Sequence, residues 1–290
     1  ARSYTQTTNV KGYFDQLRGA EMFVLRWFLN FIWNVAGNVR AVFQRLWPDN
    51  PFQARKLKII DGETSVGSTL LRVVFLTLAA SLLVIPLSNQ TLDILMALSI
   101  GGGFALILTT YLCARGKFTF LPLVLIFTGL FRIALNMAST RLILLQGKNF
   151  DGEVVQAFGN FVVSNNYVLG ILVFLGTVLF QKLHLESVFQ SSKKNHQLYQ
   201  RGRGPSSEFF ASMYGAVSFL KLEAVVMVLL TLVNIEVGLI SGFLSGQFGS
   251  VAEIAETYTF LTIGDGLVFL VSIMLATVSA RVALSKESKV

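Results

Sequence analysis

Charged residues are scarce in this sequence: Asp, Glu, Lys and Arg make up 14% of it, whereas 53% is hydrophobic. An average soluble domain has roughly a quarter of its residues charged, so this is not the composition of a soluble domain. Several apolar runs approach or exceed the roughly 20 residues that a helix needs to cross a hydrocarbon core about 30 Å thick. They lack the alternating polarity of barrel strands. The sequence therefore predicts an all-α fold, a polytopic transmembrane helix bundle.

Residues that soluble enzymes and metal proteins rely on are also sparse. The single cysteine, Cys113, can form no intrachain disulfide. The two histidines, His184 and His196, lie twelve residues apart in a basic stretch without cysteine, which indicates solvated surface and not a metal site. Lys148 follows a glycine but lacks the rest of a P-loop. We therefore expect no enzymatic activity, no cofactor and no bound metal.

Six apolar runs are long enough to be considered as membrane spans. They are Ser68–Leu87, Leu92–Cys113, Thr119–Leu145, Tyr167–Phe180, Leu222–Leu244 and Thr259–Leu284. Just before the short fourth run, an apolar face of Val154, Phe158, Phe161 and Val162 recurs at helical spacing. This spacing favours a re-entrant or interfacial piece over residues 154–163.

The first 67 residues mix aromatic and basic side chains, as in Trp27, Trp33 and Arg40. Such a mixture suits an amphipathic region at the lipid interface, although a seventh crossing within 22–37 stays open. Residues 1–10 lack the features of a signal peptide, and we expect Ala1 to be a trimmed or unobserved end. The predicted order is an interfacial region 1–67, a membrane half 68–180, a short basic cytoplasmic linker 181–221 and a second membrane half 222–290.

Lys and Arg fall mostly on one side of the predicted membrane. Nine precede Ser68, six lie in 181–221, and the connections 88–91 and 245–258 contain none. Cytoplasmic loops are the ones enriched in Lys and Arg, so both termini are predicted to be cytoplasmic, with only Lys148 dissenting. The net charge of +8 then indicates contact with anionic lipid, and we expect no nucleic-acid partner.

Polar residues inside the third run form one stripe. Arg132, Asn136, Ser139 and Thr140 recur at helical spacing on an otherwise apolar helix. A charge at the centre of a membrane helix costs roughly 2.5–3.5 kcal/mol on insertion scales, so such residues usually face protein or water. The stripe should face a neighbouring helix or an aqueous path, and a structural ion pair with an acid is the alternative.

Three further acids fall in the last two runs. Glu223 follows Lys221 at the edge of the fifth run and shares a helical face with Asn234, while Glu236 points the other way. In the sixth run, the glycines on both sides of Asp265 predict an interruption of the helix that lines a cavity. Asp265 could couple proton movement to conformational change, or could form a salt bridge with Arg132.

Four specific stretches follow one another within roughly residues 70–285. They are Phe131–Leu144, after a Leu-Pro pair at 121–122, and then 155–168, 215–224 and 252–268, the last containing Gly264-Asp265-Gly266. In this order they resemble the FlhA/SctV export-gate family of flagellar and virulence type III secretion systems.

The resemblance implies a membrane subunit that assembles with copies of itself, commonly nine, into a ring in the bacterial inner membrane. It also implies partners among the export-core membrane proteins and the exported proteins, and coupling of the proton motive force to export. Glu223 occupies the place of a family acid used in energy coupling, normally Asp, and Lys221 matches a basic position before it. The candidate network is Arg132, Asn136, Lys221, Glu223, Glu236 and Asp265.

The sequence also departs from the family pattern. The family carries a longer insertion between the fourth and fifth spans, and a large cytosolic docking domain that is not found before Val290. The sequence is consistent with a membrane portion of a longer protein and also with a reduced homologue. Two other functions therefore stay open: a structural scaffold that shapes the ring or the membrane, and an independent transporter of ions or small molecules.

Overall fold

A computed structural model describes residues 87–113, 119–163, 166–199 and 205–288. The chain divides into two units, Ala1–Thr64 and Ser65–Val290, and every described residue belongs to the second. The described part is built from α-helices, as predicted. The expected interfacial region 1–67, the possible crossing within 22–37 and nearly all of the expected span Ser68–Leu87 lie outside the described residues.

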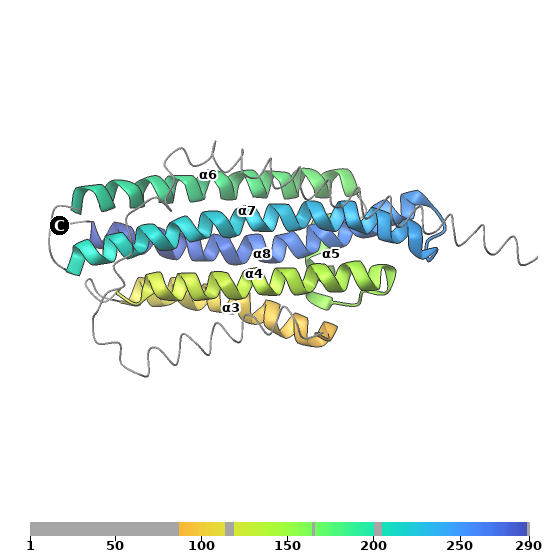
Figure 1. The fold of residues 1–290 in the computed structure, drawn as a ribbon, viewed down its shortest axis with the longest axis horizontal. Coiled ribbons are helices and arrows are strands. Elements are labelled where there is room, and N and C mark those ends of the chain that lie inside the picture. The colour runs from red at the N-terminus through yellow and green to blue at the C-terminus, as the bar shows by residue number, and fades with distance from the viewer. Residues whose placement is uncertain (1–86, 114–118, 164–165, 200–204, 289–290) are drawn as a thin grey trace, which may run out of the picture. The chain divides into compact units, whose positions relative to one another are not determined.

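Five long helices and two short ones make up the described part (Figure 1). The long helices are α3 (Asn89–Leu112), α4 (Leu121–Gln146), α6 (Tyr167–Tyr199), α7 (Pro205–Ser245) and α8 (Val251–Glu287), and the short ones are η2 (Gly147–Asn149) and α5 (Glu153–Val163). All five long helices are long and apolar enough to cross a membrane. They correspond to the last five of the six expected spans.

Helix α8 is the centre of the bundle. It contacts α3, α4, α5, α6 and α7, and Figure 1 shows α4, α6 and α7 running alongside it. In its most apolar stretch 72% of the residues are buried, against 28% in α3 and 22% in α6. The outer helices instead expose large apolar side chains such as Leu98, Leu112, Val168 and Leu172. Such a distribution suits helices that meet lipid or other apolar partners.

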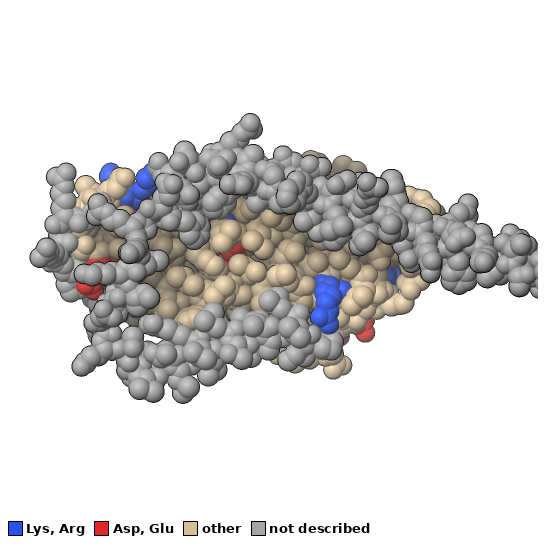
Figure 2. All heavy atoms as spheres, in the orientation of Figure 1, with Lys and Arg blue, Asp and Glu red and all other residues tan. Residues whose placement is uncertain are grey.

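Charged groups are few on the visible face of the described part (Figure 2). Some of the described charged groups lie at helix ends, where they bind helices to each other. Lys286 near the end of α8 donates to the carbonyls of Thr110 and Tyr111 at 2.9 and 2.7 Å, which places a cation at the C-terminus of α3. At the opposite end Asp93 accepts from the backbone N–H groups of Glu153 and Val154 and caps α5.

Helices α6 and α7 extend well beyond the expected spans. Residues 181–199 continue α6 and residues 205–221 begin α7, so most of the stretch expected to be a linker is helical. Tyr199 stacks on Phe210 with ring centroids 4.6 Å apart, and His196 stacks on Tyr214 at 5.3 Å. His184 and His196 are therefore half-buried side chains, which corrects the expectation of solvated surface.

The short helix α5 occupies residues 153–163, where a re-entrant or interfacial piece was expected. Its packing face is displaced by one residue from the expected one. Val155, Gly159 and Val163 are buried, whereas Phe161 is 85% exposed. The shift arises because a small residue, Gly159, allows close contact with Phe260 of α8.

Candidate functional site

The polar stripe of α4 is buried against protein. Arg132, Asn136, Ser139 and Thr140 are all buried, which confirms that the stripe faces neighbouring helices. The stripe follows directly from the α4 sequence, because residues four and seven or eight positions apart share one side of a helix.

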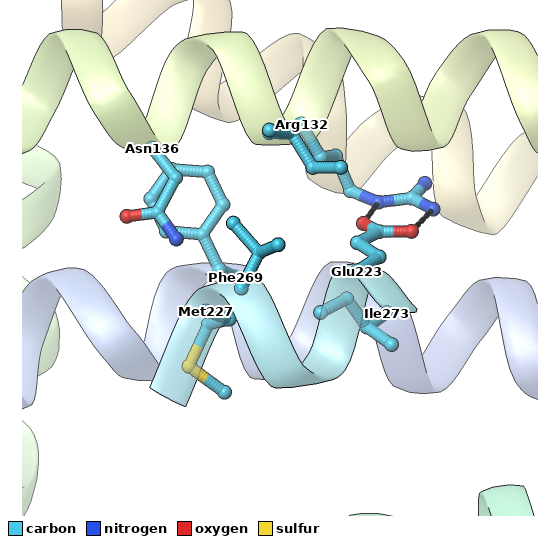
Figure 3. A pocket seen from close by; sticks show the side chains of 8 residues that line it. Arg132, Asn136, Glu223, Met227, Phe269 and Ile273 are labelled. Atoms are coloured by element: carbon cyan, nitrogen blue, oxygen red, sulfur yellow. Dashed lines mark hydrogen bonds and ion pairs between the residues drawn. The ribbon is translucent and has the colours of Figure 1, made fainter. Parts of the chain in front are cut away.

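Arg132 forms a buried ion pair with Glu223 of α7. Its Nε donates to Glu223 Oε1 and its Nη2 donates to Oε2 at 2.8 Å, and each residue is only 2% exposed. Figure 3 shows the two side chains meeting end to end between their helices. Two parallel bonds from a guanidinium to a carboxylate are strong and geometrically specific. The pair therefore links α4 to α7 across 91 residues of sequence.

Gly129 makes room for this pair. It lies one turn before Arg132, and a Cβ at this position would lie 2.8 Å from Glu223 Oε2 and 2.7 Å from Phe219 Cε1. A side chain there would push α7 away from α4. Gly129 was not among the predicted site residues, although its position one turn from an intramembrane arginine was a usable signal.

A small cavity lies beside the ion pair. Arg132, Asn136, Glu223 and Met227 line it together with Phe269 of α8 (Figure 3). Its volume of about 10 Å³ is about what one water molecule requires. The carboxylate of Glu223 thus borders a space of about the size of one water molecule.

Asp265 lies in the middle of α8 and is 2% exposed. Helix α8 runs without interruption from Val251 to Glu287, so the expected break at Asp265 is wrong. The glycine before Asp265 serves packing: a Cβ at Gly264 would fall well inside contact distance of the carbonyl oxygen of Val155 in α5. Two glycines in a membrane helix here allow close helix contact, and they do not break the helix.

The carboxylate of Asp265 has no cationic partner within the described ranges. It lies beside Ser139 of α4, whose hydroxyl donates to the carbonyl of Asn136 at 3.0 Å. The Oδ1 atom of Asp265 has no hydrogen-bond partner. The salt bridge expected as an alternative for Asp265 is also wrong, because Arg132 pairs with Glu223.

The remaining candidates lie outside this pair. Lys221 binds Glu186 of α6 at 2.6 Å and lies 4.0 Å from the ring centre of Phe189, so it connects α6 and α7 instead. Asn234 is buried like Glu223, as their shared helical face predicts. Glu236 is half-buried, and its Oε2 has no hydrogen-bond partner. Glu186 was missed, since nothing in the sequence indicates its partner.

The arrangement offers charge and proton chemistry. Within the described ranges, no group of three or more His, Cys, Asp or Glu side chains could hold a metal ion. The site therefore consists of a closed ion pair at Arg132 and Glu223 and a separate acid at Asp265.

Comparison with known proteins gives a consistent result. The FHIPEP family model matches residues 79–183 and 195–290. The "Flagellar biosynthesis protein FlhA" of Caulobacter vibrioides is 30% identical over 240 residues, which are 71% of this chain and 34% of that protein. The proteins of the same name from Salmonella typhimurium and Helicobacter pylori are 30% and 31% identical, over 74% and 73% of this chain and 36% and 33% of theirs. The chain thus spans about a third of the length of these relatives. No solved structure gives a significant match.

Proposed function

The chain belongs to the FHIPEP family, and on that basis we propose that it is a membrane subunit of a flagellar or related type III protein-export apparatus. The names of its relatives, which refer to flagellar biosynthesis, support this proposal. So do the five candidate membrane spans. The subunit would lie in the bacterial inner membrane with both termini in the cytoplasm, and would act as a translocation component without enzymatic activity.

The finer part of the proposal concerns assembly. Copies of the chain would form a ring, of nine by family resemblance, around the export-core membrane proteins. Exported proteins would pass this ring, and anionic lipid would contact its basic side. The apolar side chains exposed on α3 and α6 support this, because they leave surface available for lipid or neighbouring subunits.

Proton coupling is the proposed role of the buried acids, and the Arg132–Glu223 pair is the observation that carries it. A proton on Glu223 would remove one charge of the pair and leave the Arg132 charge unpaired in a region of low dielectric. That state would favour separation of α4 from α7, so the proton gradient could drive a movement between two helices. Asp265 would be the second protonatable group of the network.

Two experiments test the proposal. Deleting the gene in the source bacterium should abolish export through the apparatus, and unchanged export would contradict membership in it. Glu223→Gln, compared at equal membrane levels, should lower the export rate at least about tenfold and weaken its dependence on the proton gradient.

The matched control is Glu253→Gln. Glu253 also pairs with a cation, Lys148, but the two side chains are 35% and 53% exposed at a helix end, so export should stay at the wild-type rate. If Glu223→Gln also exports at the wild-type rate across a range of gradients, the coupling role is lost. The chain would then be a structural scaffold.

A further inference from the structure

Two charged side chains on the outer faces of the bundle have no partner among the described residues. Arg141 of α4 makes no hydrogen bond or ion pair there. Glu236 of α7 forms no ion pair there either, and its Oε2 atom has no hydrogen-bond partner. Both residues are half-buried. A charge within a membrane helix is costly and almost always faces protein or water, so each of these two requires a partner from elsewhere.

Arg141 projects from the side of α4 that faces away from α7. Helix α4 meets α7 through Gly129 and Arg132. Arg141 follows Arg132 by nine residues, which is about two and a half helical turns, so its side chain leaves the opposite side of α4. Met137 and Leu145, one turn away on that side, are both exposed. The outer face of α4 is therefore an apolar surface that carries one cation.

Glu236 projects from the outer face of α7. It follows Glu223 by thirteen residues, which is about 3.6 turns, so the two side chains leave roughly opposite sides of the helix. Helix α8 packs instead against Gly238, two residues further along. Leu232 and Phe243, which share the side of Glu236, are exposed. The outer face of α7 is therefore an apolar surface that carries one acid.

The two charges lie at nearly the same depth. Helices α4 and α7 run in the same direction, because the buried ion pair joins their middles and Ser241 Oγ donates to the carbonyl of Leu144 near their ends. Arg141 lies three residues before Leu144, and Glu236 lies five residues before Ser241. At a rise of about 1.5 Å per residue, the two charges differ in depth by no more than about one helical turn.

We propose that Arg141 of one copy of the chain pairs with Glu236 of the next copy, and that these two faces form the contact between neighbouring subunits. The inference rests on the ring proposed above and names the faces that meet in it. In a cyclic ring each subunit presents one face to one neighbour and a different face to the other. Rotation about an axis along the membrane normal leaves depth unchanged. Opposite charges on opposite flanks at one depth are what such a contact requires.

A second copy satisfies both charges, whereas lipid satisfies only one. Anionic headgroups would suit Arg141 but would leave Glu236 without a cation. In the proposed contact, the exposed apolar side chains beside the two charges, such as Leu145 and Phe243, would pack around the pair. An ion pair is attracted more strongly in such an environment than in water, and it fixes the register of the two surfaces.

Cysteine crosslinking of the full chain in its own membrane tests the contact. In a Cys113→Ala background, Arg141→Cys/Glu236→Cys is treated with a short membrane-permeant bismaleimide. We expect a ladder of dimers, trimers and larger species, because every copy carries both halves of the contact. Either cysteine alone should leave the chain monomeric on a denaturing gel.

The matched control is Arg141→Cys/Leu108→Cys, which should give no ladder. Leu108 is also an exposed apolar residue, but it lies at a different depth. Asn89 at the start of α3 bonds to Gln146 at the end of α4, and Leu108 lies nineteen residues further along α3. That is about 28 Å along the helix, too far for the same contact.

Charge exchange tests the pairing itself. Arg141→Glu and Glu236→Arg each place like charges in the contact, so the apparent Kd for self-association in liposomes should rise at least about tenfold. The double variant Arg141→Glu/Glu236→Arg restores an opposite pair and should recover most of the wild-type affinity. Energy transfer between copies labelled at Lys194→Cys, an exposed position in α6, measures this association in the Cys113→Ala background.

Three results would overturn the contact and would also separate it from the ring. Energy transfer without a ladder from the cysteine pair would mean that copies associate through other faces. No energy transfer between wild-type copies would refute self-association as well. A double charge exchange that associates as weakly as its parents would show that the two charges do not pair. The gene-deletion test of export is independent of all three.

Discussion

Arg132 and Glu223 lie in a region from which water is almost completely excluded. Removing two charges from water is expensive, and a buried pair compensates only when its geometry is good and its hydrogen bonds are made. The two parallel bonds between these side chains meet that condition. The pair is therefore stable as a unit, whereas either charge alone is strongly unfavourable. This difference makes the pair suitable as a switch that responds to one proton.

Arg132→Gln should destabilise the protein by about 3–5 kcal/mol, because it leaves Glu223 as an unpaired buried charge. Thermal or denaturant unfolding in detergent measures this loss. Lys148→Gln is the control: its pair with Glu253 is partly exposed to solvent, so a loss of about 1 kcal/mol or less is expected. Equal effects of the two substitutions would show that burial of the Arg132 pair contributes little.

The polar stripe of α4 could be predicted from sequence because its spacing alone puts Arg132, Asn136 and Ser139 on one side of a helix. The partner of Arg132 could not be predicted from the sequence. Three acids, Glu223, Glu236 and Asp265, were available in the last two spans, and the choice depends on how the helices pack. That packing is decided by contacts such as those of Gly129, which no local pattern reveals.

Helix α8 illustrates what glycine does in a membrane helix. Its Gly264 approaches the backbone of α5 at Val155, and its Gly266 approaches Phe174 of α6. The two glycines were expected to interrupt the span beside a cavity, but α8 is continuous there. In an apolar bundle, close backbone approach is itself a source of helix association.

Gly264→Ala should destabilise the protein by about 1–3 kcal/mol or more, because its Cβ would overlap the carbonyl oxygen of Val155 and force α5 away from α8. The loss of stability is measured by thermal or denaturant unfolding in detergent. The control is the same substitution in α6, Gly176→Ala, where the added Cβ would meet open space. It should be neutral or stabilising by up to about 1 kcal/mol. A neutral Gly264→Ala would contradict the close contact between α5 and α8.

Helix lengths in α6 and α7 were underestimated for a physical reason. Hydropathy records which residues suit the hydrocarbon core, and it falls after Phe180 and before Leu222. Helix formation continues past those points because contacts such as Lys221 with Glu186 and Tyr199 with Phe210 hold the two helices together. Apolar runs therefore predicted the spans but not the ends of the helices.

The charges of the described bundle separate between its two ends. One end gathers Asp93, Asp151 and Glu253 near Lys148, while Lys286 binds the last carbonyls of α3 at the other. If successive spans cross the membrane in alternate directions, these two groups of residues also fall on opposite sides of it. We propose that the end with Lys286 faces the cytoplasm, because membrane insertion keeps segments rich in Lys and Arg on that side.

Cysteine labelling tests this orientation. In a Cys113→Ala background, Asn149→Cys should react with a membrane-impermeant maleimide in intact spheroplasts. Lys194→Cys should react only after the membrane is opened, because both positions are exposed but at opposite ends. The reverse labelling pattern would place the termini outside the cytoplasm.

The most direct measurement of the central claim is the export rate of the double variant Arg132→Gln/Glu223→Gln. Replacing both partners of a buried pair with neutral groups is often tolerated, so the variant should assemble at wild-type levels. If the pair takes up protons, export should nevertheless fall at least about tenfold and lose its dependence on the proton gradient. Wild-type export from a normally assembled double variant would contradict the account and leave the pair as a structural link between α4 and α7.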